Sequence, residues 1–145
     1  MSGNIAHLYT FNIAISWGLL LLIWLVQIII YPGLSRIPSK DFVNYHSWYV
    51  KRISTIVLSL MIGEVIITIG WLMLENYSFY SSTSAFLVFI IWLSTFSLQV
   101  PIHKHLQSGK DDTCISRLVT TNWIRTIAWS LKAITVTIAA IRYFS

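Results

Sequence analysis

The side chains with the clearest capacity for chemistry are three ionisable groups that stand inside long apolar stretches: Glu64, Arg125 and Lys132. Charged groups within a bilayer are costly, so they usually face the interior of a helix bundle and mark a functional site. Glu64 and Lys132 each lie roughly 18 to 20 Å along a helix from its basic end, so they can meet as an acid and a base. The alternative role for such a pair is a buried ion bridge that fixes helix register.

Arg125 lies about two turns inside its apolar stretch and needs an anionic or carbonyl partner. Glu64 can be that partner instead of Lys132. Otherwise Arg125 awaits a ligand that offers a carboxylate, a phosphate, a quinone carbonyl or an enolate oxygen. The arginine therefore predicts a site for an oxygen-bearing ligand.

Histidines add groups that exchange protons near neutral pH. The segment "TFSLQVPIHKHL" (95–106) carries Gln99 and His103 four residues apart, which places them on one helix face, while His105 points nearly the opposite way. His46 shares a helical stripe with Tyr49 and Glu64. These patterns predict that His46 or His103 acts as general base.

The polar residues converge on one pocket in the cytoplasmic half of the expected bundle. Asn122 and Arg125 would hold a developing oxyanion, and Glu64 would tune or relay protons. The further residues expected to contact the ligand come from all four expected helices, the second including its extension before the span: Gln27, Tyr49, Gln99, Trp129 and Lys132.

A metal or haem is a second possibility for the same residues. His46, His103 and His105 are candidate metal ligands, although their spacing follows no specific metal motif. Haem ligation would use His46 with His103 in a dry pocket. Chemistry without a cofactor remains open beside both. The only cysteine, Cys114, has no partner for a disulfide within the chain.

Composition identifies the elements that must position these groups. The chain is 56% hydrophobic and only 10% charged, with a mean hydropathy of +0.70, whereas soluble domains carry about 25% charged residues. An apolar run of roughly 20 residues crosses a bilayer as a helix. We predict a single all-α domain (1–145), an integral membrane antiparallel four-helix bundle with spans near 8–30, 53–74, 85–103 and 118–143.

Charge predicts the orientation of this bundle. The basic residues gather in the first and third loops, which the positive-inside rule places in the cytoplasm, so both termini are expected on the non-cytoplasmic side. Pro32 and Gly33 are expected to end the first helix. Ser39 is the expected N-cap of a helical cytoplasmic extension before the second span. The expected partners are membrane lipids, with no nucleic acid and a possible homo-oligomer.

The stretches "YPGLSRIPSKDFVNYHSWYVKRIS", "PIHKHL" and "LVTTNWIRTIAW" resemble small bacterial four-helix membrane proteins. More loosely, they are similar to the anthrone oxygenase-like membrane family, whose P-x-H and N-x-x-R elements would here be Pro101 with His103 and Asn122 with Arg125. The resemblance implies a place in the bacterial inner (cytoplasmic) membrane. It also implies oxygenation or proton chemistry on an aromatic polyketide-like substrate.

Four classes of function follow from these observations. The first is a membrane-embedded enzyme, oxidoreductase- or oxygenase-like, that acts on a lipophilic small molecule entering from the bilayer. The second is a carrier of haem, metal or quinone. The others are an oligomeric transporter or channel subunit, which the absence of inverted repeats disfavours, and a non-catalytic membrane scaffold.

Overall fold

The computed structural model describes residues 2–145, and among these it is all-helical, with no strand. Four long helical rods make up the chain, and two of them contain a short π-helical segment. The elements are α1 (Ser2–Leu25), η1 (Val26–Ile30), α2 (Tyr31–Leu34), α3 (Ser39–Leu74), α4 (Phe79–Ser94), η2 (Thr95–Gln99), α5 (Val100–Leu106) and α6 (Asp112–Phe144).

All four rods are long and apolar enough to cross a membrane. The qualifying segments have 30, 36, 28 and 33 residues with hydropathies between 1.4 and 2.5. Large apolar side chains such as Leu21, Ile66 and Phe89 are more than 60% exposed, which suits contact with lipid and not with water. The prediction of an all-α integral membrane protein is confirmed at this level.

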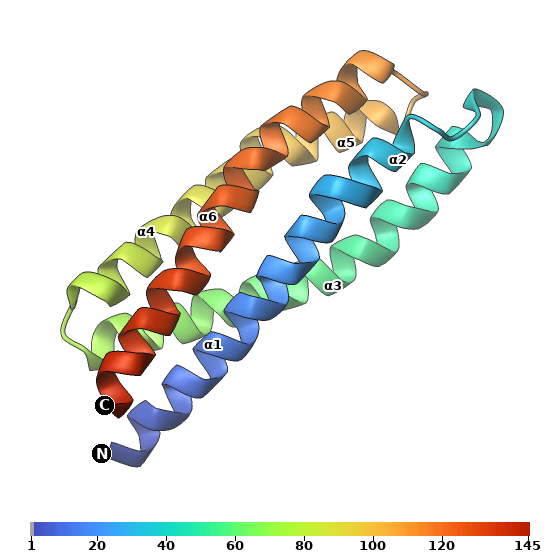
Figure 1. Cartoon of the computed structure of the whole chain (residues 1–145). Coiled ribbons are helices and arrows are strands. Elements are labelled where there is room, and N and C mark those ends of the chain that lie inside the picture. Colours follow the sequence, from blue (N-terminus) through green and yellow to red (C-terminus); the bar gives the residue numbers. More distant parts are fainter. Residues whose placement is uncertain (1) are drawn as a thin grey trace.

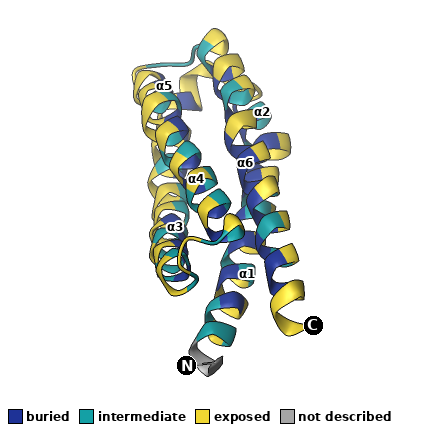
Figure 2. Ribbon diagram, turned by 90° about the vertical axis from the view of Figure 1, so that its left-hand side faces the viewer, coloured by how far each residue is buried: buried dark blue, intermediate teal, exposed yellow. Residues whose placement is uncertain are grey.

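The rods lie side by side, as Figure 1 shows, with both chain ends and the turn 75–78 at one end of the molecule. The turns 35–38 and 107–111 lie at the other end. Helix α6 packs against α1 and α4, while α3 packs against α1 and α4. Buried residues line the middle of the bundle in Figure 2, where Leu19, Leu118 and Trp129 are nearly inaccessible.

The expectation that Pro32 and Gly33 end the first helix is wrong, because the helix continues to Leu34. Proline lacks an N–H and its ring collides with the carbonyl four residues earlier. A π-helical turn relieves this conflict by shifting the hydrogen bonds to the fifth residue, so that the Tyr31 N–H donates to the Val26 carbonyl.

The third rod repeats this solution around Pro101. The Val100 N–H donates to the Thr95 carbonyl, and the helix runs on to Leu106. A π-helical turn contains one residue more than an α-helical turn and so changes the direction of the side chains around it. Such turns are frequent at functional sites. Gln27 and Gln99 lie inside the two π segments and are buried.

Helix α3 begins at Ser39, so a helical extension precedes the second span. Ser39 is not its N-cap, because it is the first helical residue and follows Pro38, which offers no side-chain hydrogen bond. Helix α6, in contrast, is capped by Asp111, whose carboxylate accepts hydrogen bonds from the N–H groups of Thr113 and Cys114. The hydrogen bond from Cys114 is the main cause that lowers the pKa of Asp111.

Candidate functional site

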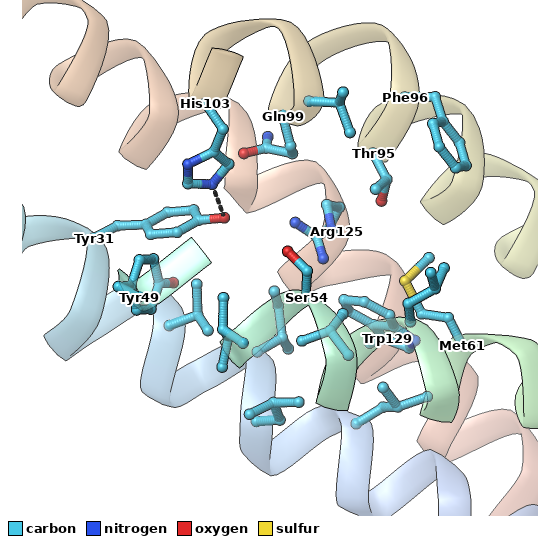
Figure 3. A pocket seen from close by; sticks show the side chains of 18 residues that line it. Tyr31, Tyr49, Ser54, Met61, Thr95, Phe96, Gln99, His103, Arg125 and Trp129 are labelled. Carbon is cyan, nitrogen blue, oxygen red and sulfur yellow. Dashed lines mark hydrogen bonds between the residues drawn. The ribbon is translucent and has the colours of Figure 1, made fainter. Parts of the chain in front are cut away.

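A cavity of about 210 Å³ lies between the first, second, third and fourth rods, next to both π segments. Its wall is mostly aliphatic, and its rim includes exposed residues of α3, η2 and α5: Leu58 (45%), Phe96 (54%) and Val100 (46%). The opening is therefore lateral, toward lipid. Figure 3 labels the polar and aromatic side chains that line it together with one methionine: Tyr31, Tyr49, Ser54, Met61, Thr95, Phe96, Gln99, His103, Arg125 and Trp129.

A hydrogen-bonded chain of three rings reaches the cavity from α3. The Tyr31 hydroxyl lies 3.1 Å from Nε2 of His103, and Nδ1 of His103 lies 3.1 Å from Nε2 of His46. His46 is fully buried and stacks on Phe42, with ring centroids 5.4 Å apart. His103 and Tyr31 line the cavity, whereas His46 supports them from behind.

Arg125 is the one cation in the cavity wall. It is 5% exposed, and no ion pair with a carboxylate is found for it among residues 2–145. One terminal N–H donates to Oδ1 of Asn122 at 3.3 Å, and the guanidinium lies 5.1 Å from the centre of the Trp129 ring. Figure 3 shows the Tyr31 hydroxyl pointing toward this guanidinium. Of the two partners considered for Glu64, Arg125 is not the one that pairs with it.

Asn122 accepts a hydrogen bond from Arg125 and does not line the cavity. The expectation that Asn122 itself donates to a substrate oxyanion is therefore corrected: it orients Arg125 instead. Gln27 donates from Nε2 to the Val119 carbonyl at 3.1 Å, so its Oε1 must face Asn122. Nδ2 of Asn122 donates to that oxygen at 2.8 Å, and Oδ1 of Asn122 is thereby turned to Arg125. Gln27 is likewise outside the cavity lining.

Gln99 offers the cavity a free acceptor. The Thr121 hydroxyl donates to the Arg117 carbonyl at 2.8 Å, so its oxygen can only accept from Nε2 of Gln99, at 3.0 Å. This fixes the amide orientation. Oε1 of Gln99 is left buried without a partner in the described chain, as is Nε of Arg125.

Glu64 and Lys132 form the predicted ion pair, with Nζ to Oε1 at 3.2 Å and both side chains fully buried. Lys132 also donates to Asn12 at 3.1 Å and Ser16 at 2.8 Å. Glu64 accepts the Trp129 indole N–H at 3.1 Å. Neither ion lines the cavity. Glu64 as a proton relay and Lys132 as a ligand contact are therefore expectations that this geometry does not support.

The metal set predicted from His46, His103 and His105 does not assemble. His105 is exposed and lies 3.3 Å from the Asp111 carboxylate, because two residues of helix turn it away from His103. Among the described residues, three groups of ligand type do gather around the turn between α5 and α6: His105 of α5, Asp111 of the turn and Cys114 of α6. Haem ligation by His46 with His103 is not prepared in this arrangement either, because Nε2 of His46 and Nδ1 of His103 lie 3.1 Å apart and hydrogen-bond to each other.

Tyr31 is the main site residue that the sequence reasoning missed, and Ser54 and Thr95 were missed with it. Tyr31 reads as an ordinary interfacial aromatic residue before a helix-ending proline. Only the continuation of the helix past Pro32 places its ring, 4% exposed, in the bundle. Tyr49 and Trp129, which the sequence places among the residues expected to contact the ligand, both line the cavity.

Chemically, the arrangement combines an unpaired cation, a free amide acceptor and a Tyr–His–His chain in a largely apolar, ring-sized space. A cation in such surroundings attracts an oxyanion or a polarised carbonyl far more strongly than it would in water. No family model matches the chain, and neither a curated protein nor a solved structure matches it.

Proposed function

We propose that the protein is an integral membrane enzyme that takes a proton from a weakly acidic, lipophilic substrate and holds the resulting oxyanion on Arg125. The observation that carries this is the buried Arg125, which faces the cavity without a carboxylate partner among the described residues. A buried cation without a counter-ion is costly, and an anionic ligand oxygen would remove that cost.

The substrate would enter from the bilayer. The exposed rim residues Leu58, Phe96 and Val100 belong to α3, η2 and α5, whose outer faces are apolar. The cavity volume of about 210 Å³ accepts one ring comfortably, since benzene occupies an apolar cavity of about 150 Å³. The rest of a larger substrate would remain between α3 and α5.

The proton would pass to His103 through Tyr31. When Nδ1 of His103 donates to His46, its Nε2 accepts from the Tyr31 hydroxyl. Tyr31 would take the substrate proton as it gives its own to His103, which leaves a neutral tyrosine, an imidazolium and the substrate oxyanion. His46 would stabilise the imidazolium, and Arg125 the oxyanion.

An oxygenase is the form of this chemistry that the resemblance supports. The P-x-H and N-x-x-R elements contribute His103 and Arg125, and both line the cavity. The ionised anthrone would then react with one molecule of dioxygen and take back one proton from the His103 imidazolium, giving the quinone, one molecule of water and neutral His103. The protein residues would supply ionisation and orientation, and dioxygen would be the oxidant.

We further propose an antiparallel bundle in a bacterial cytoplasmic membrane, with both termini on the non-cytoplasmic side. Figure 1 places the two chain ends together, and Lys40, Lys104 and Lys110 belong to the other end. Basic residues favour the cytoplasmic side. The Tyr–His–His chain would then lie in the cytoplasmic half of the membrane.

A quinone-binding carrier is the second candidate, because the same ring-sized cavity and Arg125 also suit a quinone carbonyl. The two functions differ in turnover. A carrier would bind the ring without consuming dioxygen, while the enzyme would convert many molecules per chain.

Dioxygen uptake with an anthrone tests the proposal on protein reconstituted in lipid vesicles. The wild type should consume one dioxygen per anthrone above the spontaneous rate. Arg125→Gln should lose about 100-fold in kcat, and His103→Gln a comparable amount. Arg52→Gln and His105→Gln are matched controls, because both side chains are exposed. Uptake that is equal in wild type and Arg125→Gln would contradict the proposal.

A further inference from the structure

A second cavity, of about 420 Å³, lies in a groove between α3 and α4. Its rim residues Ile62, Ile66 and Phe89 are 47 to 66% exposed, so the groove faces the bilayer. It follows the first cavity along the same side of α3. The Trp92 ring at its deep end lies 5.5 Å from Phe96, which lines the first cavity.

Two buried polar groups of this groove lack a hydrogen-bond partner within residues 5–145, the Trp92 indole N–H next to the first cavity and the Thr68 hydroxyl at the opposite end. Thr68 is 2% exposed and lines the groove, and its hydroxyl has no hydrogen-bond partner within residues 5–145. Other helical threonines donate to the carbonyl four residues earlier, as Thr55 does at 3.0 Å and Thr135 at 2.8 Å. An unpaired buried hydroxyl lowers the stability of the fold. An acceptor from outside the chain that binds the Thr68 hydroxyl would remove this cost.

The depth of Thr68 in the membrane indicates which hydrogen-bond acceptor lies near it. Thr68 lies about 24 Å along α3 from Arg52 and about 9 Å from the end of the helix at Leu74. With Arg52 at one boundary of a hydrocarbon core about 30 Å thick, Thr68 lies a few ångströms inside the other boundary. The acyl ester carbonyls of glycerolipids lie at that boundary.

We infer that the groove binds one acyl chain of a membrane glycerolipid, with the Thr68 hydroxyl donating to the ester carbonyl. The chain lies along Val88 toward Trp92. A bare hydrocarbon gains little from leaving the bilayer for the groove, because lipid is as apolar as the groove wall. The hydrogen bond to Thr68 therefore provides the selectivity, and this site is independent of the catalytic proposal.

Matched lipids test this inference. The full chain is purified in mild detergent and exposed to equal amounts of a diester phosphatidylcholine and its diether analogue with the same chains. Native mass spectrometry then measures the ratio of the two retained lipids. We expect about a threefold preference for the diester, the size of one hydrogen bond in a membrane. Thr68→Val should reduce the ratio to about one, and Thr68→Ser should keep it.

Two further variants locate the site. Thr135→Val is the control, because its hydroxyl is satisfied by its own helix, and it should keep the wild-type ratio. Ala85→Phe places a ring in the groove and should abolish retention of both lipids. Equal retention of the two lipids by the wild type would overturn the inference. An unchanged ratio in Thr68→Val, or undiminished lipid retention in Ala85→Phe, would overturn it as well, and so would a wild-type protein that retains neither lipid because a second copy of the chain covers the groove.

Discussion

Nε2 of His46 lies 3.1 Å from Nδ1 of His103, although 57 residues separate them in the chain. The contact joins α3 to α5, and the His46 side chain is fully buried. It leaves Nε2 of His103 for Tyr31, the residue that points toward Arg125. The histidine pair therefore connects α3 to the cavity residues His103 and Tyr31, although Arg125, the cation of the site, belongs to α6.

His46→Phe should lower kcat by about 10- to 100-fold, the range for groups that orient a functional side chain. KM should change little, because Arg125 still holds the substrate. Steady-state dioxygen uptake separates the two constants. A rise in KM with unchanged kcat would show that His46 serves binding and not the orientation of His103.

Gln99→Leu should reduce selectivity between an anthrone with a ring hydroxyl that is too far from its carbonyl to bond to it and plain anthrone. Oε1 of Gln99 is buried without a partner in the described chain, so it would accept a substrate hydroxyl in the proposed complex, and leucine cannot. The hydroxylated compound should lose about tenfold in affinity, and the plain one should lose nothing. Binding by fluorescence titration under nitrogen checks this, and equal losses for both compounds would argue against it.

Lys132→Met should destabilise the protein strongly, by about 3 to 5 kcal/mol, because it leaves the Glu64 carboxylate buried without its cation. Adding Glu64→Gln should recover most of the loss, since the amide oxygen still accepts from Trp129. Thermal unfolding in detergent measures both variants. If the double variant is less stable than the single one, the two residues do not act as an ion pair.

Pro101→Ala should weaken the π-helical turn, because alanine restores an N–H and removes the ring that disfavours ordinary helical bonds. Residues before the turn would rotate by about 100° relative to those after it if the turn became α-helical. Thr95 and His103, which lie on either side of the turn and both line the cavity, would then no longer face it together, and kcat should fall more than stability. Retention of full activity would show that the turn does not depend on proline.

Cys114, the only cysteine, reports the orientation of the chain. It lies near the start of α6, at the end away from the termini. A membrane-impermeant maleimide should label it in inside-out vesicles and not in intact spheroplasts. Detergent-solubilised protein supplies the labelling maximum. The opposite pattern would invert the proposed topology.

Much of the fold follows from the sequence, because apolar runs, charge and loop length each act locally. Glu64 and Lys132 were placed at one depth by counting residues, and they form an ion pair. His103 and Arg125 were assigned to one pocket from helical stripes, and both line the cavity. Periodicity and depth are therefore reliable guides where helices stay regular.

The π-helical turns mark the limit of that reasoning. A residue inserted into a helix shifts every later side chain, and the choice between a π turn and a helix end depends on packing that the sequence does not display. For this reason Tyr31 was missed. The direction of an amide is also set by distant partners, since the Val119 carbonyl decides how Gln27, and through it Asn122, is turned.

The most direct test of the account measures how much of a bound anthrone is ionised. Under nitrogen, its enolate absorbs in the visible range and cannot be oxidised. At one fixed pH, the ratio of enolate to anthrone should be at least about tenfold higher on the wild type than in empty micelles, and Arg125→Gln should return it to the micelle value. A ratio on the wild type equal to that in micelles, or one unaffected by Arg125→Gln, would contradict the claim that Arg125 holds a substrate oxyanion.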